Sequence, residues 1–535
     1  MKLGAMQDWP LRVTRLVDHA EREHGGREIV SAWGDGSVTR TNWREVAAQA
    51  RRMARALERL GIRRGDRVGT LAMNHAHHLT SWYGTVGMGG VLHTINPRLF
   101  ADQLAFIANH AEDRVLLYDA AFKPLVETLK PQWSTIEQYI CFDDGEFAQW
   151  LSAEDDDYRW VDGDEREAIG LCYTSGTTGN PKGVLYEHRS TMLHALMEVT
   201  PDVFGLSARS VVLPIVPMFH ANAWGVPWAA PLVGCKLVLS ADYRPQQMCD
   251  LFRGEAVTHS AGVPTVWLGM IEHIERTGED LGLLQSVTIG GSAAPRAMIE
   301  WFRKRGVNVG HAWGMTETSP IGTCGAPPAN WDEMTDEEQL DYVARQGRVP
   351  FGVELRIVDD EGRELPRDGV ASGQLQARGP WIVQRYFKDE HDAADADGWF
   401  DTGDVAALHP DGTMQITDRA KDVIKSGGEW ISSIELENCA VGCPGVAEAA
   451  AIGIPHPKWD ERPLLLVVRA GGSGVGEPDI RAHLSRHIAK WWQPDAIEFV
   501  EELPHTATGK LSKKTLREQF RDYRFKDAEA MVGRD

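Results

Sequence analysis

The alternation of apolar and polar positions along the chain predicts an α/β fold. Residues 42–60 (NWREVAAQARRMARALERL) place apolar side chains three and four positions apart, as one face of an amphipathic helix does. Short apolar runs at 67–73, 115–119 and 236–240 predict buried strands, and helix-like stretches separate them. Strands that alternate with helices are typical of largely parallel sheets covered by helices. We therefore expect layered α/β subdomains in the first part of the chain.

The pattern changes after about residue 350. Three segments there read as short strands joined by Asp/Gly turns, as in a small β-barrel-like subdomain: 353–366, 372–380 and 412–422. Beyond Arg419 the pattern is mixed again. It predicts a hairpin around 426–428, a helix from Ile434, and strands at 449–454 and 464–468. We expect an N-terminal domain over residues 1–419 and a smaller α+β C-terminal domain over 420–535.

Length and composition limit the classes of protein. A chain of 535 residues is too long for one hydrophobic core, so at least two domains are expected. The formal net charge of -21 disfavours nucleic acid as a partner, because an acidic surface repels phosphate backbones. The seven cysteines are scattered without CxxC spacing, which is typical of reduced thiols. We find no signal peptide and no apolar run long enough to cross a bilayer, and expect a cytoplasmic protein without a membrane segment.

The most informative stretch is residues 173–184 (YTSGTTGNPKGV). Glycines let the backbone approach phosphate oxygens closely, while hydroxyl groups and an ammonium group donate hydrogen bonds. A Walker A loop would require Gly-Lys-Ser/Thr at the start of a helix, but here Pro181 precedes the lysine and Gly183 follows it. A polar surface loop is the alternative interpretation. The candidate phosphate-binding residues are Thr174, Ser175, Gly176, Thr177, Thr178, Gly179 and Lys182.

This segment resembles the signature loop of the adenylate-forming superfamily, which comprises acyl-CoA synthetases, luciferases and peptide-synthetase adenylation domains. Companion motifs follow in the family's order, at 290–295, 311–318, 397–404, 418–419 and 504–511. The resemblance covers essentially the whole chain and is closest to bacterial medium- and long-chain fatty acyl-CoA synthetases. It implies that ATP, a carboxylic acid and CoA are the substrates and that Mg²⁺ is required. We also expect a homodimer.

The resemblance assigns residues to the nucleotide. It implies that Gly291, Ser292 and Ala293 lie along the adenine. The motif that closes around ATP begins with His311 and Ala312, and its Trp313 is expected to stack on the base. Thr316 is expected to bond a phosphate, and Glu317 to hold Mg²⁺ together with Thr174, because hard cations prefer oxygen ligands. Asp404 suits the ribose hydroxyls, and Arg419 adds a polar contact.

The C-terminal motifs imply a mobile domain. By resemblance Lys510 stabilises the charge that develops when the carboxylate attacks the α-phosphate. Lys421 matches the hinge, and the hairpin with Lys425 and Trp430 matches the one that reaches the active site during thioester formation. The two half-reactions need different groups at one carbonyl, which a domain rotation about Lys421 can supply.

The acid itself is the least determined partner. Residues 217–225 (PMFHANAWG) resemble the segment that lines the acid pocket. His220, a candidate catalytic and pocket residue, follows the Phe after which amino-acid-activating relatives carry Asp. Trp224 matches a position that gates the fatty-acid tunnel, and Gly314 stands where acetate-specific relatives have Trp. A medium- or long-chain fatty acid is therefore favoured. Aryl, aryl-alkanoic and short thioether acids, the loading of a carrier protein and a luciferase-like oxygenase remain alternatives.

Overall fold

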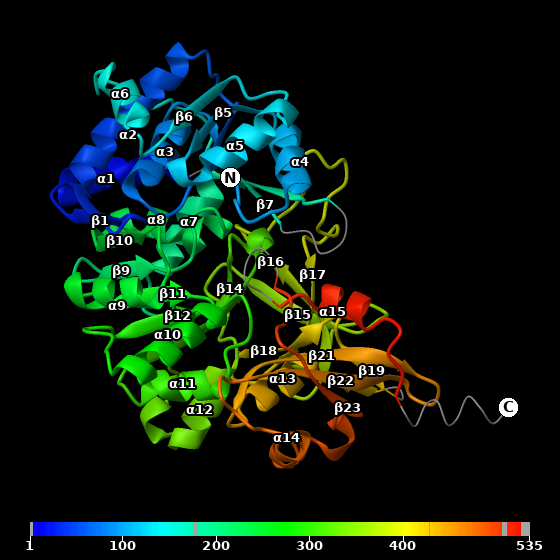
Figure 1. Ribbon diagram of the computed structural model, residues 1–535. Helices are drawn as coiled ribbons and strands as arrows, with labels where there is room; N and C mark the ends of the chain where they lie inside the picture. The colour runs from blue at the N-terminus through cyan, green and yellow to red at the C-terminus, as the bar shows by residue number, and fades with distance from the viewer. Residues whose placement is uncertain (1–3, 175–179, 427–428, 506–510, 526–535) are drawn as a thin grey trace.

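The chain folds into a large N-terminal domain and a smaller C-terminal domain (Figure 1). The computed structural model describes residues 4–174, 180–426, 429–505 and 511–525, without the side chains of 429 and 430. Within these residues, three sheets are formed by strands up to Arg419, and a fourth begins at Ile424. The predicted mixed α/β class is confirmed, and strands alternate with helices through the first two sheets.

A six-stranded sheet forms one α/β subdomain, with the strand order β6-β5-β3-β4-β7-β8. Its strands are parallel except for β8, which forms a hairpin with β7. They are β3 (Arg67–Leu71), β4 (Val91–Thr94), β5 (Asp113–Tyr118), β6 (Gln138–Cys141), β7 (Ala168–Tyr173) and β8 (Gly183–Glu187). Alternate residues of β5 pack on opposite faces: Val115 and Leu117 meet α2 and α6, whereas Leu116 meets α4 and α5. The helices are α2 (Trp43–Arg59), α3 (Ala76–Gly87), α4 (Ala101–Ala111), α5 (Lys123–Leu129) and α6 (Glu146–Ser152).

An eight-stranded sheet forms the second subdomain, with the order β14-β13-β12-β11-β9-β10-β1-β2. Only the pairs β13–β14 and β1–β2 at its two edges are antiparallel. The strands are β1 (Glu28–Ala32), β2 (Val38–Asn42), β9 (Val211–Pro214), β10 (Lys236–Ser240), β11 (His259–Gly262), β12 (Ser286–Ile289), β13 (Asn308–Gly314) and β14 (Ile321–Cys324). Helices α9 (Pro245–Gly254), α10 (Pro264–Thr277) and α11 (Arg296–Arg303) cover one face, and α12 (Asp336–Ala344) packs beside α11.

The largest core lies between the two subdomains. It joins Leu237 of β10 to Leu92 of β4 and Ile169 of β7, so side chains from both sheets share one apolar layer. Three further helices contribute to this layer: α1 (Thr14–His24), α7 (His188–Glu198) and α8 (Val226–Val233). Because this layer is buried between both sheets, it fixes the position of one sheet relative to the other.

One antiparallel sheet and one mixed sheet, which contains a parallel strand pair, complete the chain. The predicted β-rich region is a four-stranded sheet of β15 (Glu354–Val358), β16 (Ser372–Arg378), β17 (Phe400–Leu408) and β18 (Met414–Arg419). The C-terminal sheet contains β19 (Ile424–Ser426), β20 (Glu429–Ile431), β21 (Val446–His456), β22 (Asp460–Arg469) and β23 (Ala496–Phe499). Its helices are α13 (Ser433–Val441), α14 (Glu477–Leu484) and α15 (Lys513–Gln519), with separate apolar clusters on the two faces of the sheet.

Several predicted elements match closely. The helix expected over 42–60 is α2, and the Asn42 side chain accepts a hydrogen bond from the Glu45 N–H at 3.0 Å as its N-cap. The strand expected at 236–240 is β10, and the expected hairpin pairs Ile424 with Ile431. The described helices include none with the length and apolar character needed to span a membrane.

Candidate active site

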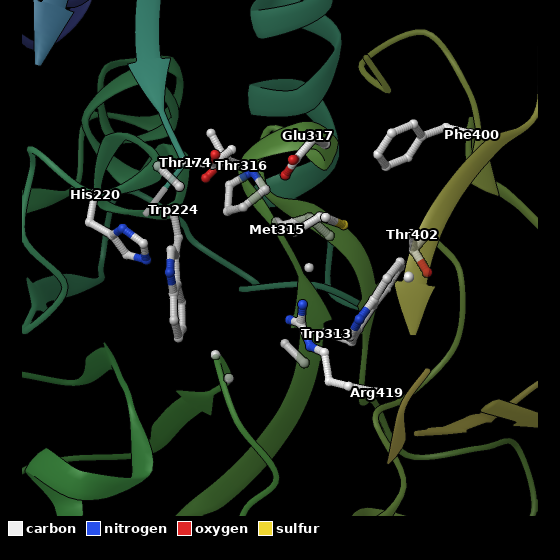
Figure 2. A pocket seen from close by; sticks show the side chains of 18 of the residues that line it. Thr174, His220, Trp224, Trp313, Met315, Thr316, Glu317, Phe400, Thr402 and Arg419 are labelled. Atoms are coloured by element: carbon white, nitrogen blue, oxygen red, sulfur yellow. The ribbon is translucent and has the colours of Figure 1, made fainter. Parts of the chain in front are cut away.

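A cavity of about 390 Å³ lies where the two α/β subdomains and the four-stranded sheet meet (Figure 2). Several described segments contribute to its wall: Thr174 with 180 and 182, Phe204, 220–221 with Trp224, Thr288 with 290–291, 312–317, 320–321 with Cys324, Tyr386, 400–403, and 419 with 421. Many of these segments follow the carboxyl ends of parallel strands. Open α/β sheets bind ligands at that edge, because neighbouring loops there leave a crevice between them.

Thr174 and Lys182 enclose the predicted phosphate loop. They lie at the facing ends of the β7–β8 hairpin, where Tyr173 pairs with Gly183. The Thr174 N–H donates to the Lys182 carbonyl oxygen at 2.9 Å, and the Lys182 N–H donates to the Thr174 hydroxyl oxygen at 3.3 Å. Both residues line the cavity. The candidates Ser175, Gly176, Thr177, Thr178 and Gly179 between them lie outside the described residues.

Thr316 and Glu317 form a short turn after β13, and both are buried. The Tyr186 hydroxyl donates to the Thr316 carbonyl oxygen at 2.8 Å, and the Val383 N–H donates to the Glu317 carbonyl oxygen at 2.8 Å. The Tyr386 hydroxyl donates to Oε1 of Glu317 at 2.9 Å. A carboxylate and the Thr174 hydroxyl on one cavity wall are hard oxygen donors, so this group of residues fits Mg²⁺.

The expected base-binding tryptophan contributes to the wall, whereas the expected ribose ligand lies behind it. Trp313 lines the cavity, and its indole N–H donates to Oδ2 of Asp404 at 2.8 Å. Asp404 is 3% exposed and also pairs with Arg419, whose Nε lies 2.8 Å from Oδ1. Here Asp404 orients one aromatic and one cationic side chain of the cavity wall, and ribose binding by Asp404 stays a prediction. Lys421 completes this side of the wall, and burial lowers its pKa.

Of five other nucleotide candidates, two lie on the wall, Ser292 is exposed, Ala293 is half-buried and His311 is buried. Gly291 and Ala312 line the cavity, but Ser292, Ala293 and His311 are not part of its described wall. His311 is fully buried: its Nε2 accepts from the Ala294 N–H at 3.1 Å, and its Nδ1 lies 3.0 Å from the Ala344 carbonyl oxygen. Burial lowers its pKa to about 4, so the ring is neutral at pH 7. The structure gives His311 a supporting position beneath the loop that follows β12.

The C-terminal candidates beyond Lys421 are not on the described wall. Lys425 lies exposed on β19, and its N–H donates to Oε2 of Glu461 at 3.0 Å. Trp430 belongs to β20, but its side chain is outside the described part of the chain. Lys510 also falls outside the described residues. Their roles stay predictions from the family resemblance.

The end of the cavity where the acid is expected has mainly apolar side chains and is built on an unusual turn. Trp224 is 7% exposed and stands beside His220 in Figure 2. It belongs to a run of positive φ over residues 221–225, with φ between +41° and +57° at the four residues other than Gly225. Residues other than glycine rarely adopt this left-handed conformation, which costs about 1–2 kcal/mol per residue in helical form. Further apolar wall comes from Phe204, Ile321 and Cys324.

Gly314 lies on the wall, and the structure adds a backbone contact to the room for a longer acid that the sequence predicts there. A Cβ atom at this position would lie 1.6 Å from the carbonyl oxygen of Pro320 and 3.2 Å from the Thr318 hydroxyl. The register of β13 against β14 shifts here, which brings the two backbones together. The glycine permits a close approach of two chain segments, and a side chain added there would point at backbone.

Several wall residues were not singled out from the sequence. Tyr386 lies in the long connection between β16 and β17 and carries no motif of its own. Phe204 and Cys324 also lack a sequence signal. Thr402 and Gly403 belong to the motif at 397–404, in which only Asp404 was selected. Thr402 is fixed by its hydroxyl, which donates to the Leu375 carbonyl oxygen of β16 at 2.8 Å, a contact that sequence patterns alone do not predict.

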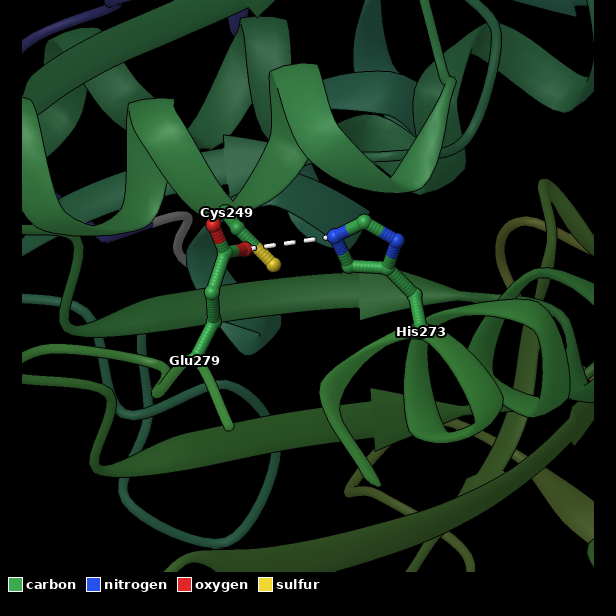
Figure 3. A group of neighbouring side chains, drawn as sticks. All are labelled: Cys249, His273 and Glu279. Atoms are coloured by element: carbon green, nitrogen blue, oxygen red, sulfur yellow. Dashed lines mark hydrogen bonds and ion pairs between the residues drawn. The ribbon is translucent and has the colours of Figure 1, made fainter. Parts of the chain in front are cut away.

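A second cluster of polar side chains lies away from this cavity (Figure 3). Cys249, His273 and Glu279 bring their donor atoms within 4.8 Å of one another. Arg253 contacts Oε1 of Glu279 at 3.4 Å, and Arg276 lies 3.2 Å from Nδ1 of His273. The Arg276 contact places the imidazole hydrogen on Nε2, which faces Glu279 at 3.2 Å. Two guanidinium groups and a donating imidazole do not suit a cation, so we assign this cluster to hydrogen bonding at the end of α10.

The fold and the composition of this cavity wall define an adenylate-forming enzyme. The chain belongs to the AMP-binding enzyme family, whose sequence pattern matches residues 17–387, and the AMP-binding enzyme C-terminal domain matches residues 435–510. It is 49% identical to a 3-methylmercaptopropionyl-CoA ligase of Ruegeria lacuscaerulensis, over 97% of this chain and 99% of that protein. It is 45% identical to a medium-chain-fatty-acid–CoA ligase of Ectopseudomonas oleovorans, over 97% and 98% of the two chains.

Solved structures agree with this assignment. The anthranilate CoA ligase AuaEII in complex with anthranoyl-AMP superposes with a TM-score of 0.86 at 25% identity, over 96% of this chain and 99% of that chain. ATP-bound MatB from Rhodopseudomonas palustris superposes with a TM-score of 0.82, also at 25% identity and with the same coverage.

Proposed function

We propose that this chain is an AMP-forming acid–CoA ligase. In the first half-reaction, a carboxylate oxygen attacks the α-phosphorus of ATP, which forms acyl-AMP and releases pyrophosphate. In the second, the CoA sulfur attacks the acyl carbonyl, and AMP leaves. One observation carries the proposal: Lys182, Thr316, Glu317 and Arg419 converge on a cavity whose other end is apolar and lined by Trp224.

The described residues suit the charges of the first half-reaction. The Lys182 ammonium group and the Thr316 hydroxyl are donors for phosphate oxygens, and the Trp313 ring offers a face for the base. Glu317 and Thr174 would hold Mg²⁺, which when bound supplies positive charge to the phosphates. No protein nucleophile is required. Lys510, by resemblance, adds the cation that reduces repulsion between carboxylate and phosphate.

The second half-reaction requires the C-terminal domain, residues 420–535, to turn about Lys421. Polar contacts cross that hinge: Oδ2 of Asp418 accepts from both the N–H and the hydroxyl of Ser433, each at 2.6 Å. Burial raises the pKa of Asp418, which a nearby Lys513 opposes. A rotation at Lys421 must rearrange these contacts, because Asp418 precedes the hinge and Ser433 follows it. A cytoplasmic homodimer is part of the same proposal.

For the acid, we propose an unbranched aliphatic chain of short to medium length. Phe204, Trp224, Ile321 and Cys324 close the cavity with apolar groups, and burial raises the pKa of the Cys324 thiol to about 12, so it stays uncharged. The 49% identity to a 3-methylmercaptopropionyl-CoA ligase favours a thioether acid as a second candidate. That acid carries sulfur where pentanoate has a methylene group, so one apolar pocket can accept both.

The test is an acid panel with MgATP, in which pyrophosphate release is measured without CoA and AMP release is measured with CoA. The panel contains acetate, pentanoate, 3-methylmercaptopropionate, octanoate, palmitate and benzoate. We expect the highest kcat/KM among pentanoate, its thioether analogue and octanoate, and loss of turnover in Lys182→Ala. Pyrophosphate release without any CoA-dependent AMP release would favour the loading of a carrier protein, and no release with any acid would refute the proposal.

A further inference from the structure

A loop outside every predicted motif connects the two sides of the phosphate site. Residues 381–387 lie between β16 and β17. The Val383 N–H donates to the Glu317 carbonyl oxygen at 2.8 Å, and the Phe387 N–H donates to the Gly183 carbonyl oxygen at 2.8 Å. Gly183 directly follows Lys182. The backbone of this loop is therefore fixed to the segment that carries the lysine and to the segment that carries the carboxylate.

The side chain between these two anchors contacts the same two groups. The Tyr386 hydroxyl donates to Oε1 of Glu317 at 2.9 Å, and the Lys182 Nζ lies 4.6 Å from the centroid of the Tyr386 ring. In this arrangement the phenol is the donor and the carboxylate is the acceptor.

Each contact restricts one catalytic candidate. The terminal torsion of a glutamate is broad and roughly two-fold, so a hydrogen bond to one oxygen selects an orientation of the carboxylate. An ammonium group above an aromatic face is attracted by the negative charge of that face. We propose that Tyr386 is a positioning residue that holds Lys182 and Glu317 together, so that the ammonium and the carboxylate meet the ATP phosphates and Mg²⁺ as one preset pair.

This inference rests on the proposed adenylation, and two variants of the full-length enzyme separate its parts. Tyr386→Phe keeps the ring beneath Lys182 and removes the bond to Glu317. Tyr386→Leu removes both contacts. The matched control is Tyr158→Phe, which also deletes a tyrosine–glutamate hydrogen bond (Tyr158 to Oε1 of Glu58, 2.6 Å), at a residue that does not line the cavity. Glu317→Gln serves as the comparison for a direct loss of the carboxylate.

Two readouts are measured: the Mg²⁺ concentration that half-saturates pyrophosphate release, and the calorimetric affinity for ATP with and without Mg²⁺. A hydrogen bond to a charged group is worth enough that its loss changes an equilibrium about tenfold or more. We expect Tyr386→Phe to raise the half-saturating Mg²⁺ and weaken MgATP binding about tenfold, with unchanged affinity for ATP without Mg²⁺. Tyr386→Leu should also weaken ATP binding without Mg²⁺, because Lys182 loses its aromatic contact.

The outcomes separate this inference from the proposed function. Wild-type enzyme that releases no pyrophosphate with any acid refutes the function, whatever the variants do. Active wild-type enzyme with an unchanged Mg²⁺ requirement in Tyr386→Phe overturns the positioning role alone. Equal weakening of ATP binding with and without Mg²⁺ in Tyr386→Phe also overturns it, because a general structural defect would act in that way. If Tyr386→Leu does not fold, as thermal melting would reveal, the Phe variant still decides.

Discussion

Replacing Gly314 with alanine tests the geometry of the cavity wall. The added Cβ atom would lie 1.6 Å from the Pro320 carbonyl oxygen and 2.7 Å from the Pro320 carbonyl carbon. Both neighbours are backbone atoms, so the contact cannot be relieved by a side-chain rotation. The edge strand β14 must move away from β13 instead. Overpacking of this kind costs about 1–3 kcal/mol, and a clash with backbone places this site at about 3 kcal/mol.

Gly269→Ala is a matched substitution that we expect to increase stability instead of decreasing it. Gly269 lies inside α10, where an added Cβ atom would meet nothing within 4 Å. Alanine in a helix interior is favoured over glycine by about 0.5–1 kcal/mol. We therefore expect Gly269→Ala to raise the thermal midpoint and Gly314→Ala to lower it.

The kcat/KM values of Gly314→Ala and Gly269→Ala provide a second measurement. Gly314 directly precedes Met315, Thr316 and Glu317, so a displaced backbone should lower kcat/KM for all acids in the panel. A side chain that filled the acid pocket would instead penalise long acids only. Wild-type stability in Gly314→Ala, or a selective loss of long acids, would refute the backbone-contact reasoning and restore the simpler interpretation in which a small residue leaves room for the chain.

Three further predictions follow from the structure. Burial lowers the pKa of His78, His188 and His194 to about 3 and of His77 and His311 to about 4. Above the ordinary histidine pKa of about 6.5, these rings are neutral in both the folded and the unfolded chain, and stability is complete. As the pH falls from there toward the lowered pKa values, the free energy of unfolding decreases by about 1.4 kcal/mol per pH unit for each histidine. Thermal midpoints between pH 7.5 and 4.5 should therefore drop steeply below pH 6, and a flat profile would contradict this. Trp224→Ala should lower KM for long acids more than for short ones, because each newly buried methylene adds up to about 0.8 kcal/mol of binding free energy. If KM changes by the same factor for every acid from acetate to palmitate, Trp224 does not contact the acyl chain. Lys510→Ala should reduce adenylation by orders of magnitude while pre-formed acyl-AMP still reacts with CoA, and equal loss of both half-reactions would argue against its assignment.

The sequence predicted those parts of the site that depend on local pattern. Thr174, Lys182, Thr316 and Glu317 belong to contiguous motifs that follow buried strands, and parallel strands bring their carboxyl ends to one edge of a sheet. Their presence on one cavity wall required no knowledge of side-chain packing.

The rest depended on contacts that no local pattern encodes. Tyr386 meets Lys182 and Glu317 only because two backbone hydrogen bonds fix its loop against both. Asp404 contacts both Trp313 and Arg419 because the register of β17 on β18 sets Asp404 opposite Arg419. The sequence predicts that His311 contacts the nucleotide. In the structure the buried His311 ring accepts a hydrogen bond from the Ala294 N–H and so supports the loop after β12.

The two ends of the cavity differ in how they are built, and this has a consequence for specificity. The phosphate end follows strand termini, whose positions are set by the ladders of two sheets. The proposed acid end instead depends on the left-handed turn at 221–224, in which the unfavourable backbone is held by packing. Gly225, next to Trp224, lies so close to Glu198 and His194 that a Cβ atom there would be 2.4 Å from the carboxyl oxygen of Glu198. Substitutions behind the turn can therefore move Trp224 without moving Lys182 or Thr316, so acid preference can change while the nucleotide end is kept. Relatives at 45–49% identity that are named for a thioether acid and for medium-chain fatty acids are consistent with such independent variation.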